Sequence, residues 1–145
     1  MKALIQRVTS ASVVVEGEIV GEISKGLLLF LGIEKDDNEQ KADKLLDKVI
    51  KYRVFADQND RMNLSLKDIQ GELLIISQFT LVADTQKGLR PSFSSAAPPE
   101  KGEALYAYFI DKATHSGLDI SAGRFGADMS VSLVNDGPVT FNLAV

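Results

Sequence analysis

The stretch LLIISQFTLVA, residues 73–83, decides the fold prediction. It opens with four apolar residues, Leu73 to Ile76, a pattern typical of a strand buried on both faces of a sheet. The only polar side chains of the stretch come next, on Ser77, Gln78 and Thr80, with Phe79 between them. Leu81 then makes the run apolar again, so we predict one strand over residues 73–83.

The polar side chains inside this strand allow two interpretations. Each buried polar group without a hydrogen bond costs about 1–3 kcal/mol, so these groups must have partners. They either bond to the neighbouring backbone, as at a bulge or a strand end, or they line a cleft and bind a ligand. Spacing alone leaves both open.

Working outward, further apolar runs predict strands over residues 3–15, 19–23, 26–33, 53–56, 119–121, 128–134 and 139–145. A first helix should be capped by Asp36 or Asp37, since an apolar stripe at helical spacing follows. A second helix should start at Pro98-Pro99 and stop at Gly117. These elements predict one domain, residues 1–145, of the α+β (mixed α/β) class, with a β-barrel-like or sandwich sheet core and two main helices.

Composition excludes several kinds of site. The 145 residues contain no cysteine, so disulfides, thiolate catalysis and cysteine-ligated zinc are excluded. The single histidine, His115, excludes a His-x-x-x-His metal pair and is better explained as a cation at a helix end. The turn after Asp57 has Met62 where a calcium loop needs glycine. We expect no metal and no cofactor.

Charge and hydropathy limit the partners. The net charge is −4 and the pI about 5.0, whereas a protein that coats duplex DNA is normally basic. Any nucleic-acid contact should therefore be local and directed at an end. The apolar runs are too short to span a bilayer, and the first residues lack the apolar segment of a signal peptide. We expect a cytoplasmic protein without membrane contact.

The usual enzyme signatures are missing. The chain has no Gly-x-Ser-x-Gly, phosphate loop or dinucleotide fingerprint. An enzyme of this sequence should work by positioning and backbone hydrogen bonds on an already activated substrate, such as an ester with a good leaving group. A long loop, residues 84–97, carries Lys87 and Arg90, which are either solvated or meet phosphates.

Two motifs carry a family resemblance. The segments SQFTL (residues 77–81) and NDGPVT (residues 135–140) look like the two signature motifs of D-aminoacyl-tRNA deacylase, the D-tyrosyl-tRNA deacylase family. MKALIQRV (residues 1–8) and GRFGADM (residues 123–129) are similar to that family too. The resemblance covers the whole chain.

The resemblance implies a function and an assembly. Such enzymes hydrolyse the ester between a D-amino acid and the 3′ end of tRNA, remove glycine from mischarged tRNA, and are cytoplasmic homodimers with active sites at the interface. Gly137-Pro138 would be cis, although base rates favour trans, and would reach into the partner's site. Its carbonyl groups would accept hydrogen bonds from the substrate α-amino group, and an L side chain would clash.

The same resemblance assigns roles to individual residues. Ser77, Gln78, Phe79 and Thr80 would contact the reacting end, with backbone N–H groups near Phe79 and Thr80 stabilising the oxyanion. Thr80 is the side-chain nucleophile candidate, but we favour assistance by the 2′-hydroxyl group of the tRNA, because nothing near Thr80 in sequence could act as its base.

Three other residues have two interpretations each. Arg7 would orient the Gly-Pro turn, or it is a surface arginine on an edge strand. Phe125 and Met129 would line a pocket for the terminal adenosine, although Met129 also suits a core. The alternative from another functional class is a non-catalytic module that binds tRNA ends or single-stranded nucleic acid.

Overall fold

The computed structural model describes all 145 residues. Its α-helices are α1 (Glu39–Lys51), α2 (Leu66–Ile69) and α3 (Pro99–Thr114), and a short 3₁₀ helix, η1, covers Phe79–Val82. Its strands are β1 (Lys2–Val15), β2 (Glu18–Ile23), β3 (Gly26–Gly32), β4 (Phe55–Ala56), β5 (Met62–Leu64), β6 (Glu72–Ser77), β7 (Asp119–Ala122) and β8 (Ser130–Ala144). The predicted mixed α+β class is confirmed.

The sheet is organised around β1. This strand pairs antiparallel with β8 along nearly its whole length, with β3 through its first half and with β2 through its second half. From β3 the sheet continues in parallel through β6 to β7. It then curls until β7 approaches β2, where the Ser121 hydroxyl donates to the carbonyl oxygen of Glu22 at 3.1 Å. The result is the nearly closed, barrel-like sheet that was one of the two predicted forms.

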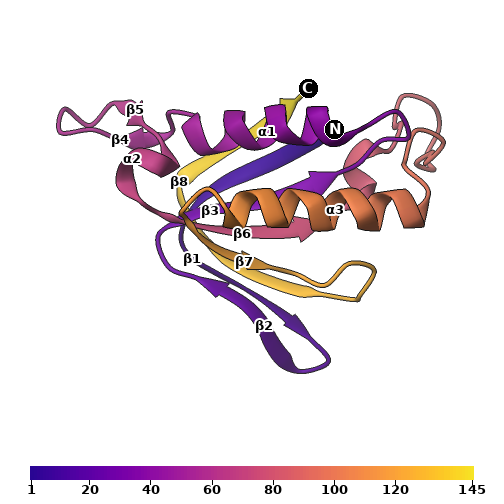
Figure 1. Cartoon of the computed structure of the whole chain (residues 1–145), viewed down its shortest axis with the longest axis horizontal. Coiled ribbons are helices and arrows are strands. Elements are labelled where there is room, and N and C mark those ends of the chain that lie inside the picture. The colour runs from indigo at the N-terminus through magenta and orange to yellow at the C-terminus, as the bar shows by residue number, and fades with distance from the viewer.

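Two cores stabilise this arrangement. α1 and α3 lie side by side over one face of the sheet, and the larger core fills the space between them and the strands (Figure 1). The whole predicted stripe of α1 is buried there: Ala42, Leu45, Leu46, Val49 and Ile50. A smaller core lies on the opposite face, inside the curl, and contains Val8, Val13, Leu28, Leu74 and Ile76. No helix of the chain is both long and apolar enough to cross a bilayer.

The predicted strand over residues 73–83 is wrong in its second half. β6 ends at Ser77, and the backbone N–H of Gln78 makes the last bond toward β3, to the carbonyl oxygen of Leu31 at 2.8 Å. The chain then turns into η1, which buries Val82 but leaves Phe79 exposed. Both interpretations of the polar side chains therefore hold. The strand ends at Ser77, and Ser77 and Gln78 also line a cleft.

The helix predictions need two corrections. The N-cap of α1 is Asn38, whose side-chain oxygen accepts from the N–H of Lys41 at 2.9 Å, and neither Asp36 nor Asp37 caps the helix. The two predicted main helices are present as α1 and α3, whereas the short α2 was not predicted; it is a single turn closed by a capping box between Ser65 and Asp68. One turn is too short to show an apolar period.

The segment of residues 135–138, which separates two predicted strands, lies within one continuous strand. β8 runs through it, so the predicted strands 128–134 and 139–145 are one element. Between Gln6↔Thr140 and Ser10↔Val134 the register shifts, with β8 using more residues than β1. The extra length bulges outward, and Gly137 and Pro138 are exposed at its tip.

Candidate active site

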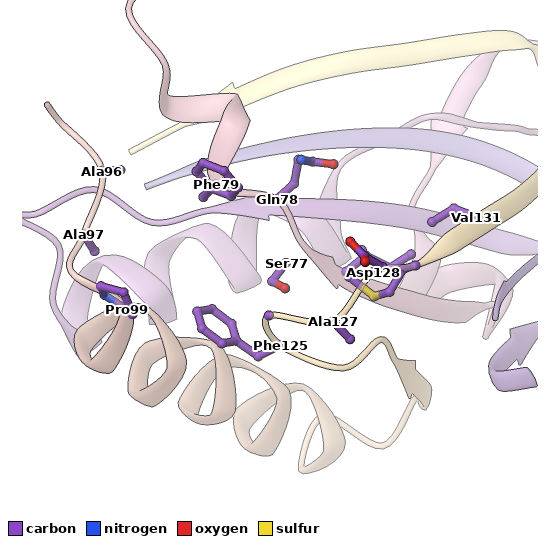
Figure 2. Close-up of a pocket in the computed structure, with 13 residues that line it drawn as sticks. Ser77, Gln78, Phe79, Ala96, Ala97, Pro99, Phe125, Ala127, Asp128 and Val131 are labelled. Carbon is purple, nitrogen blue, oxygen red and sulfur yellow. The ribbon is translucent and has the colours of Figure 1, made fainter. Parts of the chain in front are cut away.

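A pocket of about 550 Å³ opens where β6 ends. It is lined by thirteen residues from three segments, which are residues 76–79, residues 96, 97 and 99, and residues 125–129 together with Val131. Figure 2 shows Phe79 and Phe125 on opposite sides, with Ser77 between them. The volume is within the usual range for small-molecule sites.

The pocket exists because two neighbouring strands separate. β6 and β7 pair only as far as Ile75↔Ala122, and the N–H of Gly123 donates to the carbonyl oxygen of Ile75 at 2.9 Å as the last bond. β7 then leaves the sheet, while β6 continues to Ser77 alongside β3. The edge of β6 beyond Ile75 therefore faces the pocket without a neighbouring strand.

Tyr106 of α3 holds this separation in place. Its hydroxyl donates a hydrogen bond shared between two carbonyl oxygens, those of Ile75 and Gly123, each at 2.9 Å. The hydroxyl thus links the two strands at the point where they separate. Its ring lies 5.9 Å from the ring of Phe125, centroid to centroid. Burial raises the pKa of the Tyr106 hydroxyl to about 12.

We expect Tyr106→Phe to lower the free energy of unfolding by about 1–2 kcal/mol near neutral pH, because two buried carbonyls lose a donor. The raised pKa sets the pH dependence. Below the unfolded value near 10.0 the neutral hydroxyl contributes fully, and its contribution is lost as the pH rises through about 12. Urea unfolding of both proteins across this window should show the difference shrinking. Tyr52→Phe, which removes the hydroxyl of the residue that ends α1, is the control; a constant difference would contradict the prediction.

The predicted reacting-end residues meet at this pocket, with one exception. Ser77, Gln78 and Phe79 line it, whereas Thr80 does not. The Thr80 hydroxyl accepts a hydrogen bond from the Gln78 side-chain amide at 2.5 Å. No side chain caps η1, so the N–H groups of Phe79 and Thr80 have no partner within that helix.

Phe125 and Met129 also line the pocket. Met129 additionally packs against the smaller core, so it both lines the pocket and belongs to a core, as one of its two interpretations predicted. The other lining residues were not predicted as site residues: Ile76, Ala96, Ala97, Pro99, Gly126, Ala127, Asp128 and Val131. The length of the loop before Ala96 was the one signal that this segment has a role.

Gly137, Pro138 and Arg7 do not line this pocket in the single chain. The Gly137-Pro138 peptide bond is cis, as the resemblance implied. Arg7 holds the preceding residue: its Nε donates to the backbone oxygen of Asp136 at 3.1 Å, and the Asp136 carboxylate lies 3.2 Å from the same nitrogen. Arg7 Nη1 donates to the backbone oxygen of Val54 at 2.7 Å, which anchors the guanidinium. Arg7 is thus mostly buried and bonded to the Gly-Pro bulge.

No group of three or more His, Cys, Asp or Glu side chains is arranged to hold a metal ion. The pocket offers uncharged polar groups, exposed backbone and one carboxylate, Asp128. Such a set can orient an ester and polarise its carbonyl group, and it contains no histidine that could act as a base.

Comparisons with known proteins show what this chain is similar to. The model of the family described as D-Tyr-tRNA(Tyr) deacylase matches residues 4–144. Proteins named D-aminoacyl-tRNA deacylase from Pseudoalteromonas translucida, Haemophilus influenzae (strain PittGG) and Escherichia coli O81 are 62%, 63% and 57% identical, each over 100% of both chains.

Two solved structures have the same fold. The structure titled c-Myc DNA Unwinding Element Binding Protein is 39% identical, with a TM-score of 0.94 over 100% of this chain and 99% of that one. A probable eukaryotic D-amino acid tRNA deacylase is 15% identical, with a TM-score of 0.86 over 99% and 98% of the two chains, and shows the fold alone.

The fold, the pocket and these relatives define an enzyme of the hydrolase class. The chain belongs to the D-Tyr-tRNA(Tyr) deacylase family.

Proposed function

We propose that this protein hydrolyses the ester bond between a D-amino acid and the 3′ end of tRNA, and likewise removes glycine from mischarged tRNA. The observation that carries the proposal is the full-length identity of 62% with a D-aminoacyl-tRNA deacylase. The pocket supports it, because its apolar walls and few polar groups suit a nucleoside ester. We further propose that residues 1–145 act as one domain, without a cofactor, in the cytoplasm.

The chemistry proposed for the pocket is electrostatic. The N–H groups of Phe79 and Thr80, without partners inside η1, would donate to the oxyanion that develops on the ester carbonyl. One such donor is typically worth about 3 kcal/mol in the transition state. Gln78 and Ser77 would orient the ester, and a water molecule would attack its carbonyl carbon. The 2′-hydroxyl group of the tRNA would assist the departure of the adjacent 3′-oxygen, which leaves with a proton.

Thr80→Ala tests whether a protein nucleophile is needed. The hydroxyl of Thr80 accepts a hydrogen bond from the amide nitrogen of Gln78. An amide nitrogen donates hydrogen bonds but does not take up a proton, so it cannot act as the base that would activate Thr80. We expect the variant to keep kcat within about tenfold of the parent, since general-base assistance is worth at least about 100-fold where it operates. Single-turnover hydrolysis measures this. Complete loss of activity with unchanged thermal unfolding would make Thr80 the nucleophile.

Chiral selection is proposed to come from a second copy of the chain. Gly137 and Pro138 are exposed at the tip of the β8 bulge, and Arg7 fixes the residue before them. In a homodimer this tip would enter the partner's pocket, where its carbonyl oxygens accept hydrogen bonds from the α-amino group of the substrate. With amino group and ester fixed, an L side chain would meet this backbone, whereas a D side chain or hydrogen points out of the pocket.

Matched D- and L-aminoacyl-tRNA test the proposal, with free amino acid as the readout. Release from the D form alone supports it. A second candidate, a non-catalytic nucleic-acid-binding module, is favoured by the name of the 39% identical structure, a DNA-element binding protein. Binding to tRNA or single-stranded DNA without release of amino acid would favour that candidate.

A further inference from the structure

The rim of the pocket continues onto an exposed surface whose side chains the proposed chemistry does not use. We infer that this surface, made by Phe79, Phe93, Lys87 and Arg90 and called here the outer platform, binds the unpaired nucleotides that precede the terminal nucleoside of the RNA 3′ end. The inference deepens the proposed function and rests on it, because the terminal nucleoside is taken to occupy the pocket.

The two rings form the apolar part of the platform. Phe79 is 61% and Phe93 39% exposed, although large aromatic side chains are usually more buried. Their centroids lie 5.0 Å apart at 52°, so each ring fixes the other while leaving a face open to solvent. Phe79 also lines the pocket, so a chain that leaves the pocket on this side passes over both rings.

The backbone holds Phe93 firmly in this position. Asp84 and Ser92 exchange two backbone hydrogen bonds, of 2.8 and 3.0 Å, which close the neck of the loop. Beyond Phe93, the Ser95 hydroxyl donates to the carbonyl oxygen of Val82 at 2.7 Å, and the N–H of Ala97 donates to that of Ile33 at 3.0 Å. The platform is therefore built before any ligand binds, which lowers the entropic cost of binding.

The loop that this pair of hydrogen bonds closes, and the residues just after it, are locally basic. Residues 85–97 contain Lys87 and Arg90 and no acidic residue, in a chain with net charge −4. Both cations are exposed, and neither forms an ion pair in the structure. Both lie in the loop that leads to Phe93. Exposed aromatic rings together with cations that have no protein partner are features that bind single-stranded nucleic acid, since bases stack on the rings and phosphates pair with the cations.

The occupant follows from this combination. A duplex offers phosphates, but its stacked bases hide their faces. It would therefore contact the two cations and would not stack on the two aromatic rings. A peptide would gain nothing from two unpaired cations unless it were acidic. An unpaired RNA end would contact both the rings and the cations. Because it is joined to the terminal nucleoside in the pocket, it would leave the pocket across Phe79.

Binding of uncharged tRNA tests the platform without requiring hydrolysis. Fluorescence anisotropy would compare intact tRNA with tRNA trimmed of its unpaired 3′ nucleotides. We expect the parent protein to prefer the intact form, Phe93→Leu to lose about tenfold of this preference, and Phe93→Tyr to retain it because the ring remains. Removing both cations (Lys87→Ala with Arg90→Ala) should reduce the slope of log affinity against log salt by about 1.4.

Lys48→Ala removes one cation in the last turn of α1 and is the control for a charge lost elsewhere; its slope should change least. That end of the helix lies away from the loop (Figure 1). Three outcomes would overturn the inference: Phe93→Leu binding both RNAs like the parent, the double variant weakening trimmed and intact tRNA equally, or the variants changing the oligomeric state in sedimentation. If the parent lacks deacylase activity, the proposed function fails while this binding comparison still decides the platform.

Discussion

Gly137→Ala should reduce kcat/KM for D-aminoacyl-tRNA by about 100-fold, the effect expected when a positioning segment shifts by about 1 Å. A Cβ atom at this position would lie 2.7 Å from Val139 Cγ2 and 3.0 Å from the Val139 nitrogen, and the backbone φ of +134° suits only glycine. It would also lie 3.3 Å from Arg7 Nη2, the side chain that fixes the bulge. The tip of the bulge must therefore move, and the proposed cross-subunit contact moves with it.

Gly17→Ala is the matched control. Gly17 has a φ of +79° in the β1–β2 hairpin, but a Cβ atom there meets nothing within 4 Å. Its substitution introduces backbone strain of about 1–3 kcal/mol without displacing a neighbour, so activity should stay within twofold. Parent-like activity of Gly137→Ala would remove the Gly137-Pro138 bulge from the proposed site, whereas equal losses in both variants would trace the effect to general instability.

The fold could be predicted where one period dominates a segment. The stripe of α1 and the hydrophobic run of β3 determine their own burial, and Glu16-Gly17, between the predicted strands 3–15 and 19–23, forms a hairpin turn with positive φ at both residues. Segments whose conformation depends on tertiary contacts were less predictable. β6 ends at Ser77 because η1 packs there, and β8 continues through Gly137-Pro138 because β1 pairs with it on both sides of the bulge.

The pocket illustrates the same limit. Its motif residues, Ser77 to Phe79, could be named from the sequence, but its opposite wall comes from residues about 50 positions later. No local pattern says that β7 leaves the sheet after Ala122, or that Tyr106 bridges the gap this creates. Those features depend on how α3 lies across the strands.

Asp37 shows how an assignment from local pattern can miss a long-range role. Its position before α1 suggested an N-cap, yet its side chain is fully buried and 2.7 Å from the α-ammonium of Met1, which is buried as well. The second carboxylate oxygen accepts from the N–H of Glu34 at 2.6 Å, and Lys41 Nζ lies 3.7 Å from the first. A carboxylate used in this way is not available to cap a helix, and Asn38 does so instead.

Asp37→Ala should therefore lower the free energy of unfolding by about 3–5 kcal/mol, because it leaves the Met1 ammonium buried with only its weaker partners. Glu34 remains 2.9 Å from that ammonium but is partly exposed, so it compensates incompletely. This loss is a large fraction of the total stability of an ordinary domain, about 5–15 kcal/mol. Urea unfolding at fixed protein concentration, on protein whose Met1 amino group is free, measures it.

Asp47→Ala provides the comparison that isolates burial. Asp47 and Lys51 form an ion pair of 2.6 Å in the same helix, closer than Asp37 and Met1, but both side chains are 59% exposed. Distance alone would rank this pair higher, whereas desolvation ranks it far lower, at less than about 1 kcal/mol. Equal losses in the two variants would show that the Met1 ammonium reaches water in the folded protein. A loss confined to Asp37→Ala means that the start of β1 is attached to the segment before α1 by a buried charge pair.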